Sequence, residues 1–126
     1  MHNRKILQRG ILGLRGAEYY IYHLSIINPF LPVELTPKEK EVLGTFMSFE
    51  GDLAEKDRFG TTCRKIVKEK LKMSDGGLTN HLTTLKEKEA IIEVNKVWTV
   101  SSHLIPSKGQ QNYQFKITQE NETATS

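Results

Sequence analysis

A chain of 126 residues with 37% hydrophobic and 26% charged residues can build one globular domain with an arm or a tail. The formal net charge of +3 permits nucleic-acid binding without requiring it, so the distribution of charge is more informative than its total. A single cysteine excludes an internal disulfide, and the absence of a long apolar run or a signal peptide predicts a cytoplasmic protein without membrane contact.

Residues 1–16 form a basic segment that contains Arg4, Lys5, Arg9 and Arg15 but no acidic residue. Its glycines interrupt any helix, so we predict an extended arm. Such arms follow phosphates or enter the minor groove of DNA. The leucines and isoleucines of the same segment favour the alternative that it docks on a protein.

Residues 17–32 form an apolar segment, interpreted as a helix or a docking segment. Its aromatic and β-branched residues are typical of a strand, whereas the spacing of Tyr20, Leu24 and Ile27 suits a helix packed on a core. Helix is the preferred interpretation, ended by Pro29. The main domain is expected over 33–118.

The first core helix is predicted to begin at Thr36 and to end near Phe49. Thr36 and Glu39 have the spacing of a capping box, and Pro37 occupies the first helical position. Residues 50–61 are predicted to be a polar connection.

The second core helix is predicted over 62–72, the most basic stretch of the chain. If this helix crosses a DNA backbone, its positive side chains would contact phosphates. The alternative is a solvated charged face. The candidate phosphate contacts are Arg64, Lys65, Lys68 and Lys72.

The third core helix is predicted over 74–88, capped by Ser74. Leu78, Leu82 and Leu85 recur at the helical period and predict a buried face. Short polar residues occupy the other face, and such side chains suit a helix in the major groove of DNA. The candidate contacts are Ser74, Gly76, Thr79, Asn80, Thr83 and Thr84.

A β-hairpin is predicted over 93–118, after the third helix. One alternating stretch lies around 94–100 and another around 113–117, joined by a Pro/Gly turn at 105–110. Lys108 would lie at the tip, where it could reach DNA. Residues 119–126 are predicted to be a disordered tail.

This order of elements resembles the winged helix-turn-helix superfamily of bacterial and phage transcription regulators. The resemblance is carried by residues 35–43, 72–92 and the wing at 93–118. It implies an α+β, mainly helical fold of three core helices and a β-hairpin wing, preceded by the arm and the apolar segment. One departure is Gly76-Gly77, where many such helices carry base-contacting residues. Either the backbone approaches its partner closely there, or the first turn frays.

No enzyme is predicted, because the chain contains none of the familiar catalytic or nucleotide-binding motifs. We also expect no metal and no cofactor. The histidines, His2, His23, His81 and His103, have no ligand spacing. His81 is interpreted as a packing or capping residue, and Cys63 as a half-buried helix residue rather than a redox sensor.

Two functions are consistent with the sequence. The first is a small transcription regulator that binds double-stranded DNA through the residues above, with Lys108 as an outer contact, inside a bacterial or phage-infected cell. The second is a winged-helix protein-interaction module, such as a phage structural component found in the virion or a subunit of a larger complex. In either case the N-terminal segment is a candidate for homodimerisation or assembly.

Overall fold

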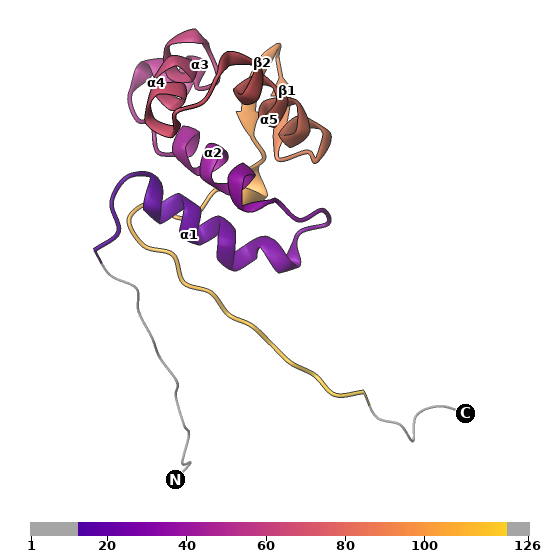
Figure 1. Ribbon diagram of the computed structural model, residues 1–126. Coiled ribbons are helices and arrows are strands. Elements are labelled where there is room, and N and C mark those ends of the chain that lie inside the picture. Colours follow the sequence, from indigo (N-terminus) through magenta and orange to yellow (C-terminus); the bar gives the residue numbers. More distant parts are fainter. Residues whose placement is uncertain (1–12, 121–126) are drawn as a thin grey trace.

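The structure, a computed structural model, describes residues 13–120 and has the predicted α+β composition (Figure 1). Most of the predicted arm, residues 1–12, and the end of the predicted tail, residues 121–126, lie outside the described part of the chain. Within the described part, no helix is long and apolar enough to cross a membrane.

The apolar segment forms helix α1 (Ala17–Ile27), as the helical interpretation predicts, and then a short 3-10 turn (Asn28–Phe30). It packs along helix α2 (Pro37–Met47), which begins at the predicted capping box. The Thr36 hydroxyl accepts the Glu39 N–H at 3.2 Å, and the Glu39 carboxylate accepts the Thr36 N–H at 2.7 Å. These bonds satisfy backbone donors that the helix itself leaves free.

The predicted polar connection at 50–61 contains a helix, α3 (Asp52–Asp57), so that prediction was wrong. A turn at Gly51, with φ of 97°, starts this helix, and Ala54 is its buried residue. Arg58 follows it and donates to the carbonyls of Phe46 and Phe49 at 2.8 and 2.7 Å, which fixes α3 against the end of α2. A helix this short has no periodic apolar stripe to reveal it.

Helix α4 (Thr61–Leu71) and helix α5 (Asp75–Glu87) match the second and third predicted helices within one residue at each end. They are joined by residues 72–74, with Lys72 in the left-handed conformation at φ 54°. The buried leucines of α5 meet α2, α4 and strand β1 in one hydrophobic core. The buried side chains of that core include Leu43, Phe46, Val67, Leu78, Leu82, Leu85 and Ile91.

The hairpin exists, but it is shorter than predicted, because the stretch around 94–100 that was predicted as its first strand contains both the turn and the second strand. Strand β1 (Ile91–Val94) pairs antiparallel with strand β2 (Val97–Val100), and Val94 faces Val97. Asn95 and Lys96 make the turn with φ of 51° and 65°. Positive φ at both positions suits the right-handed twist of the strands, and asparagine adopts it more readily than most residues.

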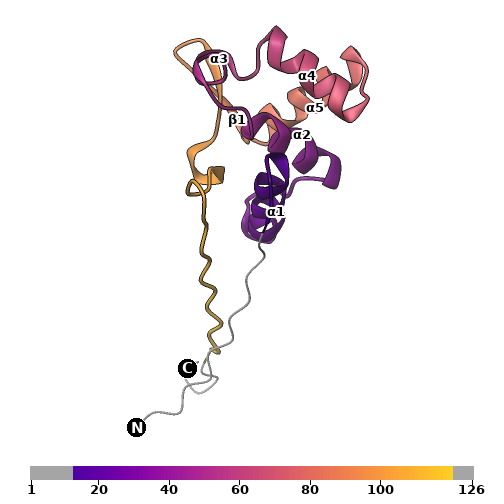
Figure 2. The same ribbon diagram turned by 90° about the vertical axis from the view of Figure 1, so that its left-hand side faces the viewer.

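The chain after β2 runs along α1 and forms no strand, although one was predicted at 113–117 (Figures 1 and 2). Tyr19 donates its hydroxyl proton to the Ser107 carbonyl at 2.7 Å, and the Phe30 and Phe115 rings stack at 5.1 Å. His23 lies between two hydrogen bonds, to the Tyr113 hydroxyl at 2.6 Å and to the Leu104 carbonyl at 2.8 Å. We call residues 105–120 the C-terminal segment. Its alternating aromatic residues serve packing on a helix and not pairing in a sheet.

Candidate nucleic-acid interface

Helix α5 presents a small polar face to solvent, opposite its buried leucines. Ser74 caps the helix as predicted, because its hydroxyl accepts the Gly77 N–H at 3.0 Å. Both glycines of the first turn lie inside the helix, so the structure does not support fraying there. The predicted contact residues that lie exposed on α5 are Gly76, Thr79, Asn80 and Thr83.

Two other residues of α5 suit this face less well. Thr84 is half-buried and donates its hydroxyl proton to the Asn80 carbonyl at 3.1 Å, within the same helix. Glu87 is exposed and brings a negative charge to the end of the helix. A carboxylate there would repel a nearby phosphate, so Glu87 disfavours close backbone contact at this end.

The basic residues of the second predicted helix do not all point the same way. Lys65 and Lys72 are exposed, as a phosphate contact requires. Lys68 instead forms an ion pair with Asp75, so its charge is already compensated. The Asp75 side chain is 85% exposed, and a pair so accessible to water contributes at most about 1 kcal/mol to stability.

Lys108 does not lie at the tip of the hairpin. It follows Ser107, whose carbonyl is bound by Tyr19 of α1, and it therefore lies beside α1. The C-terminal segment that contains it runs away from α5 (Figure 1). The turn at Asn95 and Lys96 is the tip of the hairpin, and both residues are exposed. The position predicted for Lys108 is thus taken by Lys96.

Trp98 of β2 lies beneath two positive side chains, an arrangement that the sequence did not reveal. The Lys86 Nζ lies 4.0 Å from the centre of the Trp98 rings, and the Arg64 guanidinium carbon lies 5.2 Å from it. Cations attract the negative face of an aromatic ring. Trp98 therefore brings together charges from α4 and α5 that lie far apart in the chain.

The charges of Arg64 and Lys86 are not cancelled by a carboxylate among residues 13–120, where neither makes an ion pair. Arg64 is oriented by its Nε, which donates to the Phe59 carbonyl at 2.5 Å. Trp98 is oriented in turn by its own N–H, which donates to Glu93 on the facing strand at 3.3 Å. The terminal guanidinium nitrogens of Arg64 and the Lys86 ammonium are thus available to an anion.

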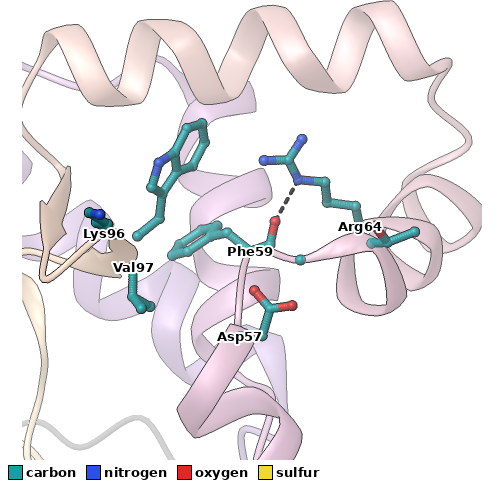
Figure 3. A pocket seen from close by; sticks show the side chains of 8 residues that line it. Asp57, Phe59, Arg64, Lys96 and Val97 are labelled. Carbon is teal, nitrogen blue, oxygen red and sulfur yellow. Dashed lines mark hydrogen bonds between the residues drawn. The ribbon is translucent and has the colours of Figure 1, made fainter.

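A pocket of about 400 Å³ opens beside this cluster, between α4 and the hairpin (Figure 3). Arg64 reaches it from α4, while Lys96 and Val97 reach it from the hairpin. Pockets that bind small molecules have volumes of roughly 300–1,000 Å³. The residues lining it are Asp57, Phe59, Gly60, Thr61, Arg64, Lys96, Val97 and Trp98.

Asp57 is the acidic residue of this pocket. Its carboxylate lies against Gly60, so close that a Cβ at Gly60 would overlap it at 1.9 Å. Gly60 precedes the first residue of α4, where the helix dipole favours negative charge. Asp57 thus lies beside the N-terminal end of α4, and its charge would repel an anion from that part of the pocket.

Metal and redox chemistry have no support in residues 13–120. No group of three or more His, Cys, Asp or Glu side chains in that range could hold a metal ion. Cys63 is buried in the core, and burial raises the pKa of its thiol more than Arg58 lowers it. A raised pKa disfavours the reactive thiolate, which supports the structural interpretation of this residue. His81 is half-buried on the flank of α5, where packing was predicted.

Comparisons of the chain with protein-family models, with curated proteins and with solved structures found no match.

Proposed function

We propose that this protein binds double-stranded DNA and acts as a small transcription regulator of the winged helix-turn-helix type. The observation that carries the proposal is the pair of uncompensated cations, Arg64 and Lys86, held on Trp98 at the edge of the polar face of α5. Thr79, Thr83 and Lys86 share one side of α5 at the helical period. The polar face of α5 therefore adjoins the charge cluster, which consists of Arg64, Lys86 and Trp98.

The connection between α4 and α5 supports the helix-turn-helix interpretation. The two helices are joined by residues 72–74 only, which is the loop length of that motif. In this arrangement α5 enters the major groove, with Thr79, Asn80 and Thr83 toward base edges, while Arg64 and Lys65 of α4 contact the phosphate backbone. The hairpin would be the wing, with Lys96 at its tip as the outer contact.

The test is fluorescence anisotropy of a labelled random-sequence duplex, titrated with the protein over a salt series from about 50 to 200 mM. We expect affinity to fall steeply with salt, because phosphate contacts release counterions. Replacing Arg64 or Lys86 by Gln should weaken binding to any duplex about tenfold at low salt and flatten the salt dependence.

Lys108→Gln is the matched control, since it removes the same charge from the α1 side of the molecule. It should bind DNA as the parent does. The proposal is wrong if the parent shows no binding at the lowest salt, and the docking face is wrong if Lys108→Gln weakens binding as much as Lys86→Gln.

A second function, a protein-interaction module, is favoured by a different surface. Large apolar side chains are exposed along α1 and the C-terminal segment, and Ile117 is 98% exposed. Exposed apolar groups of this kind are typical of protein-binding sites. If the duplex does not bind, this surface becomes the leading candidate. Homodimerisation through residues 17–31 stays a prediction. The exposed apolar residues on this surface are Tyr22, Phe30, Val33, Ile105, Phe115 and Ile117, while others lie on α3, α4 and the hairpin.

A further inference from the structure

The pocket between α4 and the hairpin has the chemistry of a nucleotide site. We propose that it binds one nucleotide unit, a phosphate group with its attached base, in addition to the duplex contacts of α5. This inference rests on the proposed function, because the pocket adjoins the face that would meet DNA. The unit is either a free nucleotide or an unpaired nucleotide of a DNA strand, which present the same chemical groups.

The positively charged side chains at the pocket would bind the phosphate group of the ligand. Arg64 and Lys96 line the pocket from different elements (Figure 3), and Lys86 lies against the same tryptophan. A guanidinium with free terminal nitrogens binds phosphate through paired hydrogen bonds. Because the Nε of Arg64 is bound to the Phe59 carbonyl, its guanidinium is held in place before a ligand arrives.

One aromatic wall supplies the base side. Phe59 and Trp98 both line the pocket, but Phe59 is only 3% exposed and packs against Phe46, so the half-buried Trp98 is the ring with exposed surface. Single-stranded nucleic acid is commonly held by stacking of bases on aromatic rings, beside a positively charged groove. A volume of about 400 Å³ is sufficient for one base with its sugar and phosphate.

Asp57 fixes the orientation of the ligand. Its carboxylate lies against Gly60 at one side of the pocket and would repel a phosphate placed there. The phosphate must therefore lie away from Asp57, at Arg64 or at Lys96, which line opposite sides of the pocket (Figure 3). The base then lies nearer Asp57 and Thr61, whose oxygens can hydrogen-bond to it.

The chain provides its own reporter, because Trp98 is its single tryptophan and lines the pocket. The experiment titrates the full chain with 2′-deoxyadenosine 5′-monophosphate and follows tryptophan fluorescence, excited where the base does not absorb. We expect saturable quenching, with binding about tenfold tighter than that of deoxyadenosine, which lacks the phosphate, or of inorganic phosphate, which lacks the base.

Two variants test the residues. Arg64→Gln should weaken nucleotide binding about tenfold, and Lys96→Gln, at an exposed turn where folding is not at risk, should weaken it severalfold. Lys108→Gln should leave it unchanged. Absence of quenching at millimolar nucleotide, or equal binding of inorganic phosphate and nucleotide, would overturn the inference.

A duplex with one unpaired terminal nucleotide, compared with a blunt duplex, separates the two sources. Binding about tenfold tighter than to the blunt duplex, with the preference reduced severalfold in Lys96→Gln, supports a strand nucleotide. Equal binding of the two duplexes, together with quenching by the mononucleotide, supports a free nucleotide. If the blunt duplex binds with the expected salt dependence and the mononucleotide does not quench, the inference fails and the proposed function stands. If the mononucleotide quenches and neither duplex binds, the proposed function fails and the pocket stands as a nucleotide site.

Discussion

The ion pair between Lys88 and Glu39 shows how single residues hold this fold together. The Lys88 Nζ lies 2.6 Å from the Glu39 carboxylate and also donates to the Glu34 carbonyl at 2.9 Å. Burial raises the pKa of Glu39, but the bonds from Lys88 and from the Thr36 N–H outweigh it and hold the pKa below its usual 4.5. The stability this carboxylate contributes is therefore present above pH 4.5 and is lost as the pH falls through the lower pKa of the folded state.

Replacing Lys88 by Met should destabilise the protein by about 3 kcal/mol, because it leaves the buried Glu39 carboxylate without its cation. Urea denaturation measures this change in the free energy of unfolding. The matched control is Lys38→Met, which breaks a pair with Glu41 in which both side chains are 42% exposed. That substitution should cost less than about 1 kcal/mol, and equal losses in the two variants would contradict the argument.

At the scale of elements, the sequence correctly predicted the helices that begin with a capping residue. Thr36 with Glu39 and Ser74 marked two helix starts correctly, since a capping side chain acts within a few residues of sequence. The hairpin was misplaced because Asn95-Lys96 lacks the glycine that usually identifies such a turn, whereas a later Pro/Gly stretch imitates one. The alternation of Ile92, Val94, Val97 and Thr99 around Asn95 was the signal that could have found it.

The sequence predicted only part of the candidate site, because local patterns show which residues share one element but not how the elements pack. The polar face of α5 follows from helical periodicity, so Thr79, Asn80 and Thr83 could be placed together from the sequence. The joining of Arg64, Lys86 and Trp98 depends on how α4, α5 and β2 pack. Nothing in local sequence specifies that packing.

The contact between α1 and α2 depends on Gly44, in the middle of α2. A Cβ at this position would lie 2.6 Å from the Cγ1 atom and 3.1 Å from the backbone nitrogen of Ile21. The side-chain atom can move, but the backbone nitrogen can move only if α1 shifts as a whole. Glycine occupies this position despite its low helix propensity, because a Cβ here would overlap Ile21 of α1.

Gly44→Ala should therefore lower the free energy of unfolding by about 1–2 kcal/mol, because the cost of overpacking exceeds the roughly 1 kcal/mol gained in helix propensity. Thermal denaturation followed by circular dichroism measures the change. Gly76→Ala is the control, since it lies in α5 with no atom within 4 Å of the new Cβ. It should raise stability by up to about 1 kcal/mol, and a gain at both positions would refute the close-packing argument.

At the scale of the molecule, two faces are separated by α2. Helices α4 and α5 and the hairpin lie on one side, while α1 and the C-terminal segment lie on the other (Figures 1 and 2). On the second face, His23 links α1 to the chain that follows β2. In the neutral ring, the Nε2–H donates to the Leu104 carbonyl, and Nδ1 accepts a hydrogen bond from the Tyr113 hydroxyl. Burial lowers the pKa of His23 more than the Leu104 carbonyl raises it.

Acidification should loosen this face. Because the folded state keeps His23 neutral, the unfolded state binds a proton more readily, and stability falls as the pH drops below the ordinary histidine value of 6.5. One group contributes at most about 1.4 kcal/mol per pH unit. Urea denaturation between about pH 7.5 and 5 measures how the free energy of unfolding falls with pH. This dependence should be weaker in His23→Gln and unchanged in the control His103→Gln, since His103 is exposed. An unchanged slope in His23→Gln would exclude the histidine as its source.

The hydrogen bond between His23 and Tyr113 has a consequence for the order in which the protein folds. It joins residues 90 positions apart, whereas α4 and α5 meet across residues 72–74. Closing a long loop costs more chain entropy than forming local contacts, so neighbouring helices should assemble first. During synthesis about 90 residues must follow His23 before its partner Tyr113 is available to α1. We expect the C-terminal segment to be the last part to dock and the first to exchange its amide protons with water.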